Sequence, residues 1–170
     1  MPTRDKEICI CGTSALVPLS MGLFAVLDAE DVQLVEGYTW HAFRHGRTFY
    51  ARTNVKSRGQ GYTSLRMHRL LSGVKGDEII DHIDGDGLNN RRSNLREASR
   101  QDNAMNRALS VNNTSGFKGV WWSKSQGAWA ASIRAHKVRH HLGYHATPEA
   151  AHAAYCEASA RLHGEFGRTA

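Results

Sequence analysis

The sequence contains little cysteine and no apolar run that approaches the length of a membrane span. Its three cysteines, Cys9, Cys11 and Cys156, are too few and too irregularly spaced for a disulfide framework. A zinc ribbon needs two cysteine pairs, and no second pair accompanies Cys9 and Cys11. The N-terminal residues also lack the apolar stretch of a signal peptide. We therefore expect reduced thiols in a cytoplasmic protein that has no membrane partner.

Acidic residues are missing from one long stretch of the chain. Residues 113–147 contain five Lys or Arg and no Asp or Glu, whereas residues 81–112 contain five of each kind. The whole chain has a formal net charge of +6 and a pI near 9.5, values that many ordinary basic soluble proteins share. The basic stretch is interleaved with Trp121, Trp122 and Trp129, and this combination favours a nucleic-acid-binding surface.

At 170 residues the chain can form one medium domain or two small ones. Short apolar and aromatic clusters separated by glycine and polar residues predict strands over residues 8–80. Residues 79–109 read as a strand, a loop, a second strand and a helix, and residues 111–116 as a linker. The expected fold class is α+β, with a strand-rich N-terminal lead (1–64), a central core (65–110) and a three-stranded antiparallel sheet packed on one helix (113–170).

The central core carries a carboxylate, an imidazole and two amides at set spacings, as Asp81, His82, Asn94 and Asn103. Oxygen donors from Asp81 and Asn103 suit Mg²⁺ or Mn²⁺ rather than structural zinc. His82 titrates near neutrality and can act as a general base toward water. Neighbours on a flat strand point to opposite faces, so Asp81 and His82 share a site only if the strand bends or ends there. The chemistry indicated is metal-assisted hydrolysis of a phosphodiester.

The run from Asp81 to Leu95, followed by Asn103, resembles the HNH nuclease motif in the variant whose last histidine is an asparagine. The resemblance covers about residues 65–109 and implies a ββα-metal nuclease core. It implies that Asp81 and Asn103 are the metal ligands and that His82 is the general base. Asn94 then matches the asparagine of the catalytic set that ties down the loop between the strands. The basic residues of this region that we expect to contact DNA are Arg91, Arg92 and Arg107.

Four segments beyond residue 113 carry a second resemblance: Phe117-Lys118-Gly119-Val120, Trp129-Ala130-Ala131-Ser132-Ile133-Arg134, Leu142-Gly143-Tyr144, and an alanine-rich run ending in Leu162-His163-Gly164. Together they resemble the APETALA2-type DNA-binding domain of ethylene-response factors. This resemblance implies a sheet that lies in the major groove of DNA. Ser132 and His145 depart from the pattern of that family. The positions that match its DNA-contacting or motif residues are Lys118, Trp121, Lys124, Trp129, Arg134, Arg139 and His141.

The two resemblances together predict a metal-dependent DNA endonuclease that hydrolyses phosphodiester bonds in duplex DNA. They imply the homing or mobile type, acting in the cytoplasm of a bacterial or phage-infected cell. The expected partner is double-stranded DNA, and the expected cofactor is Mg²⁺ or Mn²⁺ with no small-molecule cofactor; the oligomeric state stays open. One alternative is a DNA-binding regulator with an inactive nuclease core. Another is a structural metal-binding protein that uses histidine and cysteine.

Overall fold

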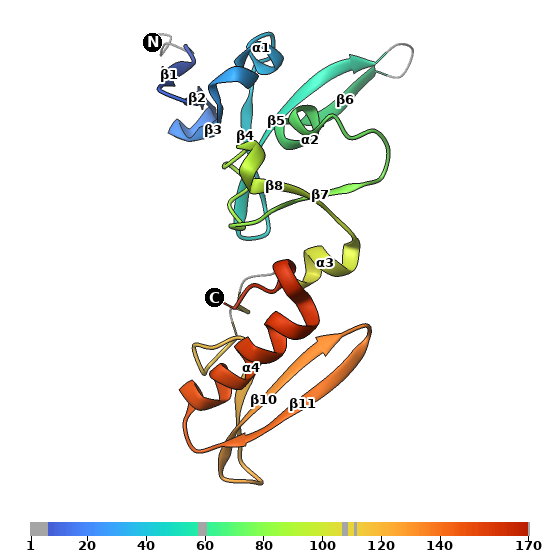
Figure 1. The fold of residues 1–170 in the computed structure, drawn as a ribbon. Helices are drawn as coiled ribbons and strands as arrows, with labels where there is room; N and C mark the ends of the chain where they lie inside the picture. Colours follow the sequence, from blue (N-terminus) through green and yellow to red (C-terminus); the bar gives the residue numbers. More distant parts are fainter. Residues whose placement is uncertain (1–6, 58–60, 107–108, 111, 170) are drawn as a thin grey trace. The chain divides into compact units, whose positions relative to one another are not determined.

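The computed structural model describes residues 7–57, 61–106, 109–110 and 112–169 (Figure 1). It is a mixed α/β structure with several small antiparallel sheets and few helices. The chain divides into two compact units, one ending at Ser99 and the other beginning at Arg100. This division falls within the segment 65–110 that we expected to form one core. The strand-rich lead and the Asp81-to-Leu95 motif therefore share the first unit.

Alternating burial explains the N-terminal sheet of the first unit. Ala15 and Val17 in one strand and Ala25 and Leu27 in the next are buried, and their neighbours along each strand are more exposed. This period of two is that of a strand with one face on a core. The sheet has the order β1-β2-β3 and is antiparallel throughout. Its strands are β1 (Cys9–Cys11), β2 (Ser14–Pro18) and β3 (Phe24–Asp28).

A second antiparallel sheet follows in the same unit, with the order β4-β5-β6. Gly46, at a φ of 61°, turns the chain between the first two strands, a conformation that glycine adopts without a steric penalty. The apolar run that begins at Met67 forms a short helix within the region expected to be strands, and it ends at Gly73 with a φ of 67°. These elements are β4 (His41–His45), β5 (Thr48–Ser57), β6 (Gly61–Arg66) and α2 (Met67–Ser72).

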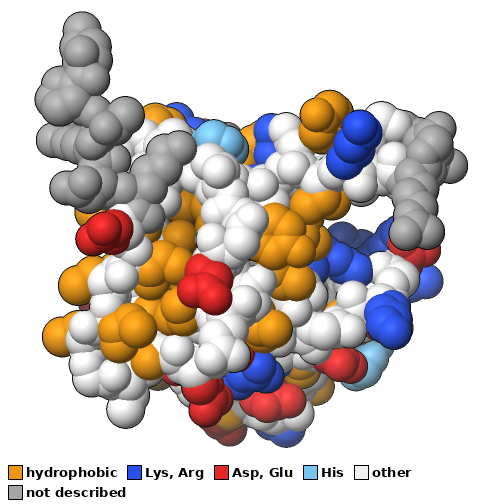
Figure 2. Space-filling model, turned by 90° about the horizontal axis from the view of Figure 1, so that it is seen from above, with side chains coloured by type: hydrophobic (Ala, Val, Ile, Leu, Met, Phe, Trp, Pro, Cys, Tyr) orange, Lys and Arg blue, Asp and Glu red, His pale blue; other side chains and the backbone are white. Residues whose placement is uncertain are grey.

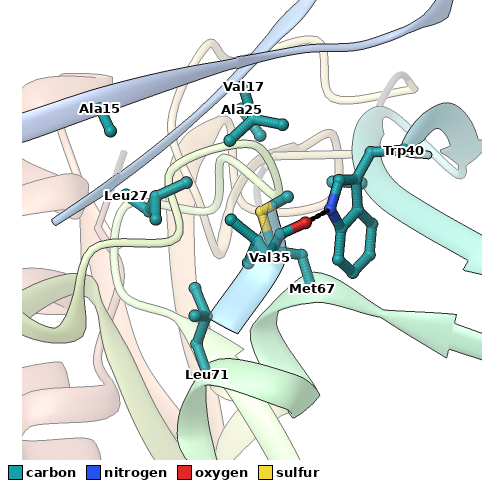
Figure 3. Close-up of a cluster of buried hydrophobic side chains, with 9 residues drawn as sticks. Ala15, Val17, Ala25, Leu27, Val35, Trp40, Met67 and Leu71 are labelled. Atoms are coloured by element: carbon teal, nitrogen blue, oxygen red, sulfur yellow. Dashed lines mark hydrogen bonds between the residues drawn. The ribbon is translucent and has the colours of Figure 1, made fainter. Parts of the chain in front are cut away.

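The hydrophobic core of the first unit collects side chains from both sheets and from the short helices (Figure 3). Trp40 is buried in it, and its indole Nε1 donates a hydrogen bond of 2.9 Å to the Val35 carbonyl oxygen. Met67 and Leu71 contribute the buried face of α2. The polar atom of the tryptophan is therefore satisfied inside the core. The short helical segments of this region are η1 (Ser20–Gly22), η2 (Ala29–Asp31) and α1 (Val32–Val35).

The Asp81-to-Leu95 motif forms a two-stranded antiparallel hairpin of β7 (Ile79–His82) and β8 (Leu95–Ala98) with a long loop between them. The loop contains one 3-10 turn, η3 (Arg92–Asn94). Backbone bonds join the loop to the N-terminal sheet: Val26 donates to Leu88 at 2.9 Å, and Asn90 donates to Val26 at 2.7 Å. The N-terminal lead therefore supports the loop of the motif directly.

Several large apolar side chains of the first unit remain exposed. They include Ile10, Met21, Phe24, Leu34 and Tyr38. Figure 2 shows hydrophobic surface interspersed with charged groups on the face that it views. Within the described ranges, no helix is long and apolar enough to cross a membrane.

The second unit is an antiparallel sheet with the order β11-β10-β9 and a long helix packed against it. Ala131 and Ile133 of the central strand are buried against Ala151, Tyr155 and neighbouring side chains. The three expected strands and the expected helix are therefore present. The elements are α3 (Arg100–Met105), β9 (Val120–Ser123), β10 (Ala128–Ala135), β11 (Val138–His145), α4 (Pro148–His163) and η4 (Gly164–Phe166).

Helix α4 begins as its sequence predicts. Thr147 is the N-cap, and its hydroxyl accepts a hydrogen bond of 3.2 Å from the Ala150 amide. Pro148 occupies the first turn, where its missing N–H has no cost, and Glu149 favours the positive end of the helix dipole.

The described part of the expected linker is an ordered turn in the second unit. The Asn113 Oδ1 atom accepts from the Gly116 amide at 2.7 Å, and its Nδ2 atom donates to the Phe117 carbonyl at 2.8 Å. The Ser115 hydroxyl donates to the Val120 carbonyl at 2.8 Å. These polar residues therefore serve as turn-forming groups rather than as a flexible tether.

Candidate active site

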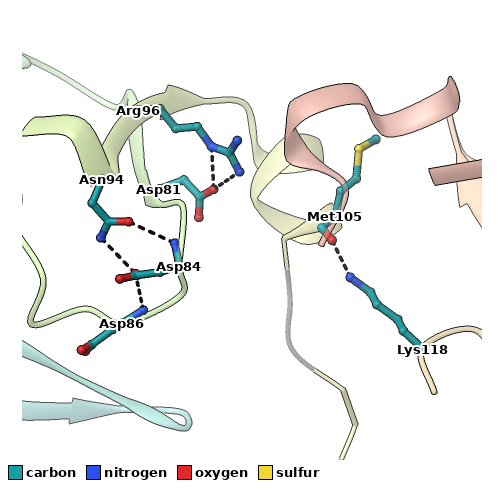
Figure 4. A network of polar contacts seen from close by, with 7 residues as sticks. All are labelled: Asp81, Asp84, Asp86, Asn94, Arg96, Met105 and Lys118. Carbon is teal, nitrogen blue, oxygen red and sulfur yellow. Dashed lines mark hydrogen bonds and ion pairs between the residues drawn. The ribbon is translucent and has the colours of Figure 1, made fainter. Parts of the chain in front are cut away.

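Asp81 is a buried carboxylate near the end of β7, with a relative exposure of 5%. It pairs in register with Arg96 on β8. The guanidinium of Arg96 donates from Nε at 3.1 Å and from Nη2 at 2.9 Å, both to the Oδ2 atom of Asp81 (Figure 4). Arg96 thereby compensates a charge whose burial would otherwise be costly.

His82 is the last residue of β7 and is also buried, at 4% exposure. Burial lowers the pKa of its imidazole, while an interaction with Asn90 and the negative charges of the neighbouring aspartates, Asp84 foremost, act in the opposite direction. The ring is therefore biased toward the neutral form that can accept a proton. The strand ends directly after His82, which is one of the two conditions under which it and Asp81 could serve one site.

Two residues that the sequence did not point to lie against His82. The ring of His68, on α2, is 5.0 Å from the His82 ring at an interplanar angle of 88°. The ring of Tyr50, on β5, is 5.6 Å from each of the two histidine rings. Burial, followed by the neighbouring His82, lowers the pKa of His68 to about 3. In the sequence, His68 is marked only weakly, as a histidine inside the apolar run that begins at Met67.

Asn94 closes the loop of the motif, as the asparagine in that position was expected to do. Its Nδ2 donates to the Asp84 Oδ1 atom at 2.9 Å and to the Asn89 carbonyl at 2.8 Å. Its Oδ1 atom accepts from the Asp84 amide at 3.1 Å (Figure 4). Burial alone would raise the pKa of Asp84, but hydrogen bonds from Asn89, from the Asp86 amide and from Asn94 outweigh it and lower this pKa.

Gly87 is where the loop approaches β5 most closely. Its amide donates to the Thr48 hydroxyl at 3.0 Å. A Cβ atom at this position would lie 2.4 Å from the Phe49 carbonyl oxygen and 2.7 Å from the ring of Tyr50. Only glycine fits between the loop and this strand, so the glycine at position 87 has a packing cause.

The two arginines of the loop have different surroundings. Arg92 forms a bidentate pair with the buried carboxylate of Asp31, with Nε–Oδ2 at 3.0 Å and Nη2–Oδ1 at 2.6 Å. Its backbone amide also donates to Asp28 at 2.8 Å. Arg91 is exposed, and its Nη2 donates to the Ser14 hydroxyl at 2.8 Å. Arg92, which we expected to contact DNA, thus forms an ion pair within the protein.

Asn103, the second expected metal ligand, lies on α3 in the second unit, and its side chain is exposed. Arg107 lies outside the described residues. The donor atoms of Asp81 and Asn103 are a carboxylate oxygen and an amide oxygen, the hard ligands that Mg²⁺ and Mn²⁺ prefer. Throughout the described part of the chain, no cluster of three or more His, Cys, Asp or Glu could hold a metal ion. The described residues therefore contain no ligand set for a closed zinc site.

The outer face of the second unit's sheet, opposite α4, carries an aromatic and basic cluster. Arg139 lies over the ring of Trp121, with 4.8 Å from its guanidinium carbon to the ring centroid. His141 is 6.4 Å from Trp121 and 4.7 Å from Tyr144, ring centroid to ring centroid. Arg139 also donates to the Ser132 hydroxyl at 2.9 Å. Arg134, opposite Arg139 in the register, and Lys124, in the turn before β10, are exposed.

Two residues of the expected DNA-binding set face other parts of the second unit. The ammonium of Lys118 donates to the Met105 carbonyl at 2.7 Å (Figure 4). It also donates to the Arg168 carbonyl at 2.8 Å. Burial lowers the pKa of Lys118 to about 8. Trp129 packs against the cluster of Val120, Ala131 and Ala151, because it alternates with residues that face away from α4. We therefore place neither side chain on the outer face of the sheet.

Comparison with known proteins finds similar sequences in this region and across the chain. A sequence model described as HNH endonuclease matches residues 72–105, which include β7, the Asn94 loop and α3. The chain is 37% identical over 118 residues to Protein 3.8 of Escherichia phage T7, over 66% of this chain and 97% of that protein. It is 29% identical over 145 residues to a protein of Acanthamoeba polyphaga mimivirus named Uncharacterized HNH endonuclease L560, over 85% of this chain and 73% of that protein. No solved structure gives a significant match.

The matched region contains the buried carboxylate, the buried imidazole and the asparagine-closed loop described above. The match to the phage protein extends over nearly all of that relative. The chain therefore belongs to one family with Protein 3.8 of phage T7 and carries an HNH endonuclease domain over residues 72–105, which implies a nuclease that acts on DNA.

Proposed function

We propose that this protein is a divalent-metal-dependent endonuclease that hydrolyses phosphodiester bonds in duplex DNA. One observation carries the proposal: buried Asp81 and His82 end strand β7 beside a loop that Asn94 closes. These groups are the carboxylate, base and positioning amide that such a reaction requires.

In this proposal Asp81 and Asn103 would hold Mg²⁺ or Mn²⁺, which when bound supplies charge neutralisation at the phosphate. His82 accepts a proton from a water molecule at its imidazole. The oxygen of that water forms a bond to phosphorus, and one phosphorus–oxygen ester bond of the DNA backbone breaks. The released oxygen takes a proton from solvent water and leaves as a hydroxyl group. The lowered pKa of His82 supports the assignment, because a neutral ring is needed to take the proton.

The test is cleavage of mixed duplex DNA with Mg²⁺, followed by sequencing of the ends. His82→Ala should slow cleavage by roughly 10²- to 10⁴-fold. The matched control is His41→Ala, the same change at an exposed histidine of the same unit, which should leave the rate unchanged. EDTA should stop the reaction, Mn²⁺ should restore it and Zn²⁺ should not. Normal cleavage by His82→Ala, or highest activity with Zn²⁺, would refute the proposed chemistry.

We also propose that the outer face of the second unit's sheet holds the DNA, in the manner that the APETALA2-type resemblance implies. The ordered cluster of Trp121, Arg139, His141 and Tyr144 supports this, because arginine and aromatic side chains can contact bases and backbone. The binding of duplex DNA should be measured in the His82→Ala background, so that cleavage does not interfere. With on the order of five phosphate contacts, the logarithm of affinity should fall with the logarithm of salt concentration at a slope of about −4 to −5.

The homing or mobile type is the finer assignment that we propose, with action in the cytoplasm of an infected host cell. The viral relatives support it. Sequenced ends from a phage or bacterial genome should then fall at one or a few recurring long sites. Specific binding without any cleavage in Mg²⁺ or Mn²⁺ would favour the regulator with an inactive core instead.

A further inference from the structure

The ring of His82 needs an external constraint to serve as a general base. The last side-chain torsion of histidine has broad energy minima, so the backbone of β7 does not by itself set the direction of the ring nitrogens. A proton acceptor is effective only when its lone pair points at the water that it activates. Contacts around the ring must therefore supply the orientation.

Two rings from other elements provide such contacts. His68 of α2 lies edge-on to His82, with 5.0 Å between centroids and an angle of 88° between planes. Tyr50 of β5 approaches the same ring at 5.6 Å and 66°. Tyr50 and His68 also touch each other, at 5.6 Å and 64°. The three rings thus form a closed triangle of edge-to-face contacts, a preferred arrangement for aromatic side chains.

Groups from neighbouring elements also restrict the positions of Tyr50 and His68. Gly87 lies so close to Tyr50 that a Cβ atom there would be 2.7 Å from the ring. On β6, the Arg66 guanidinium carbon lies 5.7 Å from the Tyr50 ring centroid. His68 is buried, at 4% exposure, on the core-facing helix α2. A rotation of the His82 ring would therefore have to displace rings that are held by the loop, a strand and a helix.

His68 stays neutral near neutral pH and does not change its charge there, because burial lowers its pKa to about 3. Its effect on the chemistry must pass through the ring that it contacts.

We propose that His68 and Tyr50 are positioning residues that hold the His82 ring in the orientation in which it takes a proton from water. This inference rests on the proposed role of His82 as general base. It concerns the direction of the base, and it assigns neither His68 nor Tyr50 a contact with the DNA.

The experiment compares His68→Phe, which keeps a ring, with His68→Leu, which keeps apolar volume without a ring edge. His68→Leu should slow single-turnover cleavage by roughly 10- to 100-fold, since small misplacements of a catalytic group have effects of this size. DNA affinity should not change. His68→Phe should stay within about threefold of the unmodified protein. Leu71→Ala is the matched control: it removes a buried side chain from the same helix and should lower the melting temperature without the rate loss.

A readout independent of activity is the ¹⁵N spectrum of the His82 ring. Its signals should move or broaden in His68→Leu and in Tyr50→Leu, and they should stay close to the original in His68→Phe and in Leu71→Ala. Equal rates and equal His82 spectra in His68→Leu and His68→Phe would overturn the positioning role. Normal cleavage by His82→Ala would instead overturn the proposed function, so the two failures are distinguishable.

Discussion

Replacement of Asn94 by aspartate provides the sharpest test of the loop, because the change keeps the shape of the side chain and reverses the polarity of one end. The Nδ2 group of Asn94 donates to the Asp84 carboxylate at 2.9 Å and to the Asn89 carbonyl at 2.8 Å. In Asn94→Asp an acceptor oxygen would face both of these acceptors. At pH 7 it would also place a second negative charge against Asp84.

The expected magnitude follows from the three hydrogen bonds of Asn94. A neutral bond contributes about 1 kcal/mol net, and a bond to a charged group about 1.5–3 kcal/mol. Asp84 is exposed, so hydrogen bonds to water replace part of the stabilisation that is lost with the Asn94 side chain. We therefore expect Asn94→Ala to lower the free energy of unfolding by about 2 kcal/mol. Repulsion between two carboxylates, about 1 kcal/mol at 4 Å in bulk water and about 4 kcal/mol near a protein surface, makes Asn94→Asp worse, at about 3–4 kcal/mol.

The assay is calorimetric melting of the full chain at several pH values. About 3 kcal/mol corresponds to roughly 12–24 °C for a domain of up to about 100 residues. Because Asp84 raises the pKa of the introduced carboxyl above its unfolded value, the defect should be largest above that pKa and should shrink as pH falls through it. Asn113→Ala is the control, since it removes comparable turn bonds from the second unit. Equal melting temperatures for Asn94→Asp and the unmodified protein at pH 7 would refute this account of the loop.

Three further outcomes follow from the structure. The pKa of His82 is lowered below its usual value of about 6.5. The cleavage rate should therefore stay constant as pH falls through 6.5 and decrease only at lower pH. A pH–rate profile with a midpoint at or above 6.5 would contradict this. Arg139→Ala should weaken DNA binding by roughly 10-fold and reduce the salt slope by about 1, as measured by fluorescence anisotropy, because Arg139 lies on the exposed face beside Trp121. Arg92→Ala should lower the free energy of unfolding of the first unit by about 2–3 kcal/mol in urea unfolding, because buried Asp31 loses its bidentate partner. Adding Asp31→Asn to Arg92→Ala should recover part of this loss. If the double variant recovers nothing, an uncompensated charge on Asp31 is not the cause.

Features that depend on neighbours in the chain could be predicted from the sequence. The spacing of Asp81, His82, Asn94 and Asn103 is a local property, and it indicated the hairpin that the structure contains and the chemistry that we propose. The alternation along β10 separates Ile133, which faces α4, from the exposed Arg134. Thr147 and Pro148 marked the start of α4 for similar reasons, because capping uses groups within one turn of the helix.

Features that depend on distant segments were decided only by the tertiary structure. Arg92 stands in a basic run that resembles a DNA contact, but Asp31, sixty-one positions away, binds its guanidinium. Lys118 matches an expected contact position, yet its ammonium donates to the carbonyl of Arg168, fifty positions away.

The site around His82 depends both on the local sequence and on contacts between distant segments. Its place after Asp81 and before a glycine-rich loop identified it as a candidate base from the sequence alone. The rings of His68 and Tyr50 that surround it come from α2 and β5, and no periodicity links these positions to His82. Their meeting depends on the packing of the β4-β5-β6 sheet and α2 against the hairpin. The sequence alone indicated His82 as the group proposed to accept the proton, and the tertiary structure decided what surrounds it. The reason is that the chain encodes local spacing directly, and long-range contacts only through packing of the folded core.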